Sequence, residues 1–241
     1  MKKWQKILLI VLFVFTFIAS LIRNMPAWLL GGLISHYSQG RVSTSYEHGT
    51  FWNGHAMFYS RDANGKSSVP LQVLGWTIKL GFSKFVDISF TAANQPIAHA
   101  SLTKQGLVAE NIDLRLSLDQ LAPLLGNLSS FGLSGNVHVS SSRIILGKGL
   151  SGTVNINLED VGSGISPVNP VGSFQITADL ASTSINVSSS PDSVLIVNGS
   201  GNFNNLILNS KVQNDKKEQM LQFMTMMGIP QADGSYQLKV F

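Results

Sequence analysis

The 241-residue chain contains no cysteine and is poor in charged residues, which make up 12% of its length. The lack of cysteine excludes a disulfide framework and any thiol chemistry. No Gly-x-Ser-x-Gly nucleophile elbow is present, and glycine-rich segments precede strand-like patterns instead of helices, which excludes a phosphate-binding loop. The five histidines are scattered without ligand spacing. We therefore expect no catalytic residues, no metal site and no cofactor.

A strongly basic surface is also missing, although the formal net charge is +4. Lys2, Lys3, Lys6 and Arg23 account for the whole excess, so the remaining 13 basic residues balance 13 acidic ones. A nucleic-acid partner requires clustered basic residues. The neutral remainder therefore argues against such a partner.

Those four charges flank the longest apolar run of the chain, residues 7–22, whose only polar members are Thr16 and Ser20. As a helix the run would span about 24 Å, against about 30 Å for a bilayer core. Trp4 can lie at one interface, and the flanking Lys6 and Arg23 can extend outward. The pattern predicts one transmembrane helix.

The orientation of this helix in the membrane follows from the three lysines before the apolar run and the single Arg23 after it. The positive-inside rule places the N-terminus in the cytoplasm and the rest of the chain outside it. A cleaved signal peptide is the alternative, but Ile18-Ala19-Ser20 is a poor cleavage site because its outer position is bulky. The expected layout has three parts: a cytoplasmic start and anchor (1–23), a membrane-proximal helical segment (24–40) and a periplasmic β-rich domain (41–241).

The membrane-proximal segment reads as a helix with Pro26 in its first turn. Its apolar face either rests on the bilayer or packs on the domain that follows, and the sequence leaves both open.

From Arg41 onward the apolar period changes to two, which is typical of strands with one buried face. Asn64-Gly65 predicts a hairpin turn. Trp76, Ile78, Leu80 and Phe82 are expected on one face of a strand. The whole pattern predicts a mainly β protein in which an extended, curved antiparallel sheet carries a few short helices.

Glycine-rich repeats punctuate the later strands. Residues 132–139 return seventeen residues later as 149–156, and 199–203 is a looser third copy. We expect each copy to be a turn that leads into a strand. Asp119 is expected to cap a short helix, and residues 162–172 form a long connection within the same sheet.

One late helix is predicted over residues 215–227, where Met220, Phe223, Met224 and Met227 repeat at helical spacing. A methionine-rich face can form an adaptable contact surface for a partner. A helix that covers a sheet needs the same face, and this second role is favoured.

The sharpest local motif is Gly49-Thr50-Phe51-Trp52-Asn53-Gly54, followed later by Leu74-Gly75-Trp76. Its two glycines allow the backbone to bend or bulge while two large rings enter the core. Glu47, His48 and His55 lie nearby, but their spacing matches no known zinc pattern. The motif is therefore interpreted as a structural corner built from Gly49, Thr50, Phe51, Trp52, Gly54 and Trp76.

Together with the short anchor, Pro26 and the C-terminal Asp233-Gly234-Ser235-Tyr236-Gln237-Leu238, this motif resembles the type II secretion system protein N family. Phe51 stands where that family more often has Leu or Val. The resemblance implies an accessory inner-membrane component that assists export of folded proteins from the periplasm across the outer membrane. Its partners would be other inner-membrane components of the system.

A second hypothesis is a membrane-anchored lipid-binding or lipid-transfer protein, because a curved sheet with one apolar face resembles AsmA-like proteins in outline. Residues that line a groove and residues that line a core alternate in the same way, so the sequence does not separate the two functions.

Overall fold

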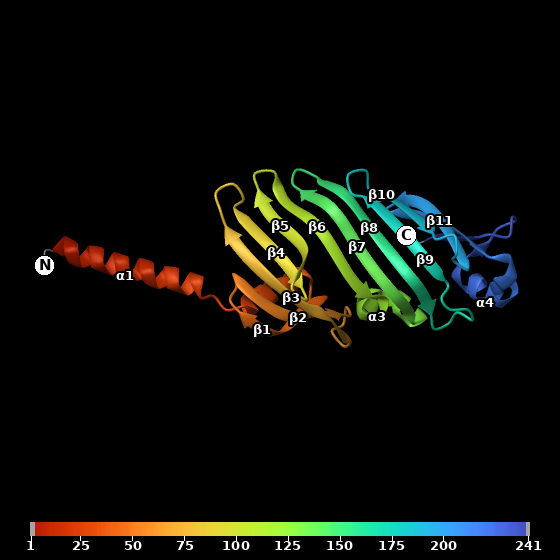
Figure 1. The fold of residues 1–241 in the computed structure, drawn as a ribbon, viewed down its shortest axis with the longest axis horizontal. Helices are drawn as coiled ribbons and strands as arrows, with labels where there is room; N and C mark the ends of the chain where they lie inside the picture. The colour runs from red at the N-terminus through yellow and green to blue at the C-terminus, as the bar shows by residue number, and fades with distance from the viewer. Residues whose placement is uncertain (1–2, 240–241) are drawn as a thin grey trace.

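The computed structural model describes residues 3–239 and confirms the mainly β fold with one long N-terminal apolar helix (Figure 1). Residues 1, 2, 240 and 241, which the sequence analysis assigned to the cytoplasmic start and to the end of the β-rich domain, lie outside the described residues. Fourteen strands of the described chain form one open antiparallel sheet. They are β1 (Val42–Gly49), β2 (Asn53–Arg61), β3 (Ser68–Leu80), β4 (Val86–Ala92), β5 (Gln95–Thr103), β6 (Gly106–Ser117), β7 (Leu133–Leu146), β8 (Leu150–Ser163), β9 (Gly172–Asp179), β10 (Ser184–Ser189), β11 (Leu195–Asn202), β12 (Asn205–Val212), β13 (Ile229–Pro230) and β14 (Tyr236–Lys239).

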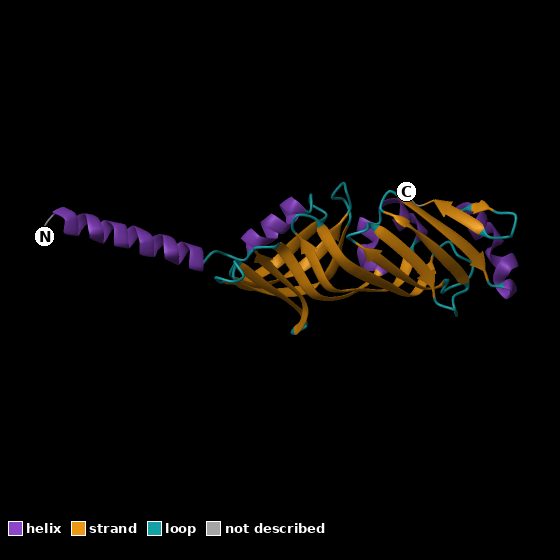
Figure 2. Ribbon diagram, turned by 90° about the horizontal axis from the view of Figure 1, so that it is seen from above, coloured by secondary structure: helices purple, strands orange, loops and turns teal. Residues whose placement is uncertain are grey.

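The helices lie at the two ends of the sheet and at one point along it. The apolar helix α1 projects from the body as a separate rod, and α4 covers the opposite end (Figures 1 and 2). The α-helices are α1 (Lys3–Arg23), α2 (Trp28–Tyr37), α3 (Leu118–Leu121) and α4 (Lys217–Met227), and the 3-10 turns are η1 (Ala122–Leu124), η2 (Gly126–Phe131) and η3 (Asn214–Lys216).

Strands that follow one another in sequence are neighbours in the sheet, and only β13 and β14 exchange places at the end. The predicted turn at Asn64-Gly65 joins β2 to β3, and the predicted connection at 162–172 joins β8 to β9 within the same sheet. Both edges are poor templates for strand addition. β1 contains a bulge between Ser45 and His48, and β13 has two residues, one of them Pro230.

A first core lies under the N-terminal strands. Ala56, Phe58, Trp76 and Ile78 are its buried strand residues, and Ala27 at the start of α2 completes it. The sequence left open whether α2 faces the core or the bilayer. The helix does pack on this core, through Leu30 and Ile34, while Trp28, Leu33 and Tyr37 remain exposed on its outer side.

A second core lies under the C-terminal strands and is covered by α4. Met220, Phe223 and Met224 are buried in it, and Met227 packs against it. The methionine stripe therefore covers the sheet and is not available to a partner. The exposed apolar residues of α4 are Leu221 and Met226.

The short helix α3 ties the strand that precedes it back to the N-terminal strands. Gln120 donates from Nε2 to the carbonyl of Leu71 (2.6 Å), and its own carbonyl accepts from the hydroxyl of Ser60 (2.6 Å). The predicted cap of this helix is wrong. Ser117 occupies the N-cap and forms a capping box with Gln120, while Asp119 lies in the first turn.

The prediction that each glycine repeat is a turn leading into a strand is correct in part, since Gly132 and Gly149 directly precede β7 and β8. Other glycines of the repeats lie inside strands. Gly135 and Gly152 lie inside β7 and β8 with φ values of +126° and +130°, and Gly199 and Gly201 lie inside β11. A Cβ on Gly152 would come within 2.4 Å of the carbonyl oxygen of Arg143. These glycines therefore allow close approach of neighbouring strands, and β7 and β8 pair irregularly near Gly135.

Candidate functional site

The described residues contain no group of three or more histidine or acidic side chains that could hold a metal ion. His48 and His55 are cross-strand partners in β1 and β2, with ring centroids 5.3 Å apart. The carboxylate of Glu47 accepts a hydrogen bond from Thr44 (2.7 Å). The three side chains do not converge on one point, which agrees with the interpretation of the flanking sequence as structural.

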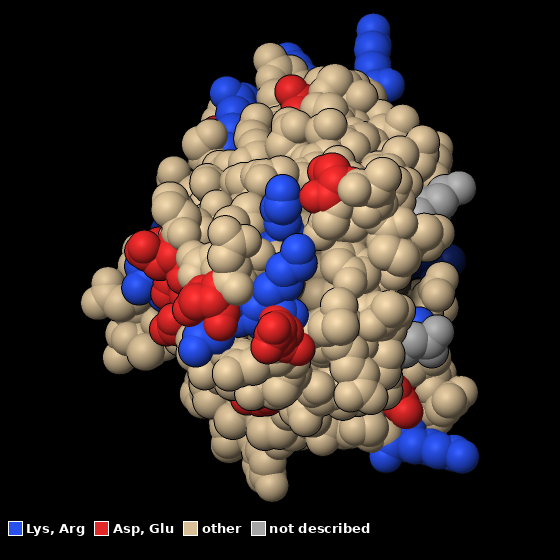
Figure 3. All heavy atoms as spheres, turned by 90° about the vertical axis from the view of Figure 1, so that its right-hand side faces the viewer, with Lys and Arg blue, Asp and Glu red and all other residues tan. Residues whose placement is uncertain are grey.

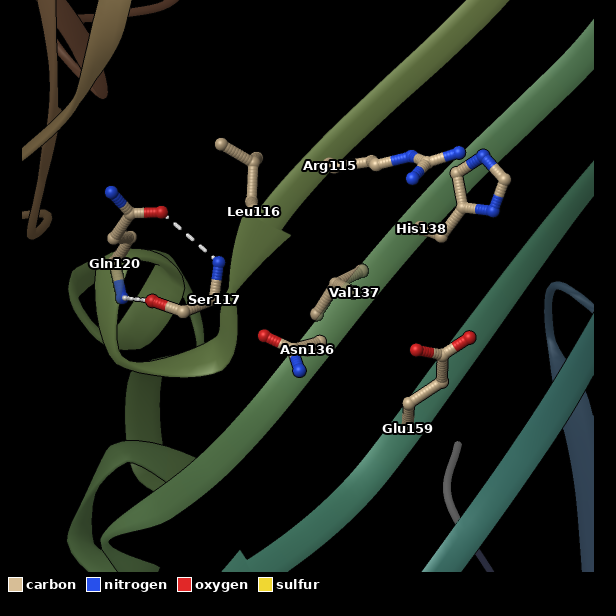
Figure 4. Close-up of a pocket in the computed structure, with 8 residues that line it drawn as sticks. All are labelled: Arg115, Leu116, Ser117, Gln120, Asn136, Val137, His138 and Glu159. Atoms are coloured by element: carbon tan, nitrogen blue, oxygen red, sulfur yellow. Dashed lines mark hydrogen bonds between the residues drawn. The ribbon is translucent and has the colours of Figure 1, made fainter.

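A polar hollow of about 450 Å³ lies on β6, β7 and β8 and is lined by Ser117, Gln120, His138 and Glu159, among others (Figure 4). Ser117 is turned toward Gln120, whose backbone N–H its hydroxyl accepts, and away from His138. His138 Nε2 instead lies 3.0 Å from Asp113 Oδ1. The serine and the histidine therefore do not form a nucleophile–base pair.

The Gly-Thr-Phe-Trp-Asn-Gly motif forms the turn between β1 and β2. The backbone N–H of Thr50 donates to the carbonyl of Asn53 (2.8 Å), and the N–H of Asn53 donates to the Thr50 hydroxyl (3.1 Å). Gly49 has φ +90°, and a Cβ on Gly54 would lie 2.7 Å from the indole of Trp76. The two glycines are thus required by a tight turn and by an aromatic ring that lies against the backbone.

This turn holds the end of the anchor helix. The indole N–H of Trp52 donates to the carbonyl of Ile22 (2.6 Å), and the backbone N–H of Phe51 donates to the carbonyl of Met25 (2.7 Å). The indole N–H of Trp76 donates to the carbonyl of Phe51 (3.0 Å) and supports the turn from β3. We call the set formed by residues 22–26, residues 49–54 and Trp76 the anchor junction.

Two further contacts extend the sheet pattern into the anchor junction. Pro26 and Thr50 form an isolated antiparallel bridge, and the backbone N–H of Ile78 donates to the carbonyl of Trp52 (2.6 Å). Beside them, Trp52 and Leu80 line an apolar hollow against the last turns of α1. The end of α1 is therefore tied to the body by hydrogen bonds from this turn, with the apolar hollow beside them.

The structure brings together all six residues assigned to the structural motif, and it places the methionine stripe of α4 at the other end of the sheet (Figure 1). Sequence reasoning missed Ile22 and Met25 as partners of the motif. Both contribute main-chain carbonyl groups, for which their side chains give no signal.

Two carboxyl groups whose pKa values are lowered lie in turns outside the anchor junction. Backbone N–H groups of Ser182 and Ala181 lower the pKa of Asp179, and hydrogen bonds from Ser235 lower the pKa of Asp233. Each carboxylate accepts hydrogen bonds within its own turn, which accounts for the direction of both shifts.

The fold defines a single-sheet β protein joined to one apolar N-terminal helix of 21 residues that is long enough to cross a membrane. Residues 41–239 match the family model described as type II secretion system (T2SS), protein N, so the chain belongs to this family. The resemblance carried by the motif is thereby confirmed, and the chain is a component of type II secretion. No curated protein and no solved structure matches it.

The anchor junction predicts that Trp52→Phe keeps the fold but loosens α1. The substitution retains an aromatic ring and removes the donor to Ile22, a loss of about 1 kcal/mol in the free energy of unfolding. Because the chain has no native cysteine, spin labels at Ala19→Cys and Ser151→Cys can report the distance between α1 and the sheet. We expect a narrow distribution in the parent protein and a broader one in the variant.

Trp28→Phe is the matched control, since Trp28 is exposed on the neighbouring helix. Equal widths for Trp52→Phe and Trp28→Phe would contradict a fixed anchor junction.

Proposed function

We propose that the chain is an accessory inner-membrane component of the type II secretion system, which assists export of folded proteins from the periplasm across the outer membrane through non-covalent protein contacts. Family membership supports the assignment to the system. The observation that carries the accessory, membrane-held role is the anchor junction, because its hydrogen bonds join an exposed apolar helix directly to the β body that follows it.

The charges around α1 support one orientation. Three lysines precede the apolar run and Arg23 follows it, so the N-terminus lies in the cytoplasm and the sheet in the periplasm. Figure 3 shows the end of the body farthest from α1, where basic and acidic residues are interspersed among uncharged ones. This face has no single-sign patch of the kind that binds nucleic acid.

A protein contact surface is proposed at the same far end. Leu221 and Met226 on the outer side of α4, and Ile229 of the edge strand β13, are all exposed. Leu221 and Met226 are thus the exposed apolar residues of α4, in place of the buried methionine stripe, and Ile229 adds to them from β13. Their position at the opposite end of the sheet from α1 lets them reach components that lie away from the bilayer (Figure 1).

Deletion of the gene is expected to leave folded substrates in the periplasm, and the parent gene is expected to restore export. Leu221→Glu should fail to restore it, because a charge on an apolar contact weakens association. Leu128→Glu is the control, since Leu128 is similarly exposed (48%, against 54% for Leu221) but lies on η2. Secreted enzyme activity and periplasmic substrate are measured in each strain.

Normal export in the deletion strain, under conditions that require the machine, would contradict the proposed role. Full restoration by Leu221→Glu would contradict the surface on α4.

One observation favours lipid binding as a second candidate function. A row of directly paired residues crosses five strands on the face that holds Ile78 and Ile88, and directly paired residues share a face. The row consists of Val86, Leu102, Leu107, Leu146 and Leu150, and its four leucines are exposed. An uncovered apolar row next to a covered core is a feature of a groove that holds acyl chains.

Mass spectrometry of the purified full chain tests this candidate. Lipid bound in the groove should be present in the parent protein and in Leu128→Asp but lost in Leu107→Asp, while lipid around α1 is common to all three. Equal amounts in the three proteins would contradict the groove.

A further inference from the structure

The hairpin between β3 and β4 carries the most exposed aromatic residue among those described. Phe82 is fully exposed, and Leu80 (66%) and Phe85 (47%) on either side are also open to solvent. The sequence pattern placed Phe82 on the same strand face as Ile78 and Leu80, but the strand ends at Leu80 and Phe82 lies beyond it. Three large apolar side chains on one short turn form a patch that indicates an interaction site.

The position of this hairpin identifies the surface that it faces. Leu80 lines the apolar hollow together with Ile18, Ile22 and Trp52, and Arg23 borders the same hollow. Leu80 therefore lies at the level of the last turns of α1. Two perpendicular views agree that the hairpin is at the end of the body from which α1 leaves (Figures 1 and 2).

The length of the apolar run places the bilayer surface at the level of Leu80 and the last turns of α1. The apolar run 7–22 spans about 24 Å, roughly 6 Å less than a typical hydrocarbon core. A short helix draws the adjoining part of the protein toward the apolar layer or thins the bilayer around it. In either case the residues beside Ile22 lie at the boundary between acyl chains and headgroups.

The composition of the hairpin suits that boundary. Residues 79–86 contain Lys79, Lys84, Phe82 and Phe85 and no acidic residue. Phenylalanine and leucine side chains of interfacial segments enter the boundary between headgroups and acyl chains, and lysines are attracted to anionic lipids. Lys84 lies 3.9 Å from Asp87 at the base of β4, a half-exposed pair that leaves its ammonium group accessible.

We propose that the β3–β4 hairpin inserts Phe82 into the headgroup region of the bilayer next to α1 and forms a second membrane contact. This inference rests on the proposed function in one respect, that α1 spans the membrane. A single helix leaves the body free to rotate about the helix axis. A second contact on one side of α1 fixes which face of the sheet is turned toward the bilayer.

The experiment uses the full chain in vesicles of phosphatidylethanolamine and phosphatidylglycerol that contain nitroxide-labelled lipid. An environment-sensitive fluorophore is attached at Ser83→Cys, next to Phe82, and at Leu12→Cys in the middle of α1. Ser182→Cys, in the exposed turn between β9 and β10, reports the aqueous level. We expect the labels at residues 83 and 12 to be quenched several times more than the label at 182, and Phe82→Asp to abolish the quenching at 83.

The outcomes separate the inference from the proposed function. Quenching at residue 12 with none at 83 would overturn the hairpin contact and leave the anchor standing. No quenching at either position would overturn the spanning helix and the inference with it. A label at 83 that is shielded from both lipid and an aqueous quencher would indicate a protein contact and would also overturn the inference.

Discussion

The hydrogen bond from the Trp52 indole to the carbonyl of Ile22 is the interaction on which the placement of the sheet relative to α1 depends. The sheet is a meander in which nearly every strand pairs with its neighbours in sequence, so the placement of the whole body relative to α1 is set where β1 meets β2. Trp52 and Phe51 bind the chain that leaves α1, and Trp76 binds Phe51 from the next strand but one. These hydrogen bonds tie the end of α1 to the turn between β1 and β2.

Beyond this turn the sheet is supported at two places. α2 covers the first core, and α4 covers the second with Met220 and Met224. α3 links strands that are apart in the sheet through Gln120. The four exposed leucines of the row belong to neither core. The apolar surface that remains open is therefore the part of the sheet that neither α2 nor α4 covers. The bulge in β1 and the shortness of β13 disfavour strand addition at the two edges of the sheet.

Alternation, turn residues and one family motif were sufficient to predict the fold class, the long apolar N-terminal helix, the late helix and the corner at residues 49–54. The sequence also contained a signal for the cap of α3 that was read incorrectly. Ser117 and Gln120 have the spacing of a capping box, whereas no Glu or Gln stands three residues after Asp119. Other contacts of the structure had no signal in the sequence. The partners of Trp52 and Phe51 are carbonyl groups, and the close strand approach at Gly152 depends on pairing with a distant strand. Phe82 continued the alternation of β3, but the strand ended before it.

We infer that α1 spans the membrane and holds the sheet on its outer side. This orientation can be tested by labelling with a membrane-impermeant maleimide in cells whose outer membrane alone is permeable, with single cysteines at Lys3 and Ser182. We expect rapid labelling at residue 182 and labelling at residue 3 only after the inner membrane is broken. Labelling at residue 3 while the inner membrane is intact, or protection of residue 182, would contradict this orientation.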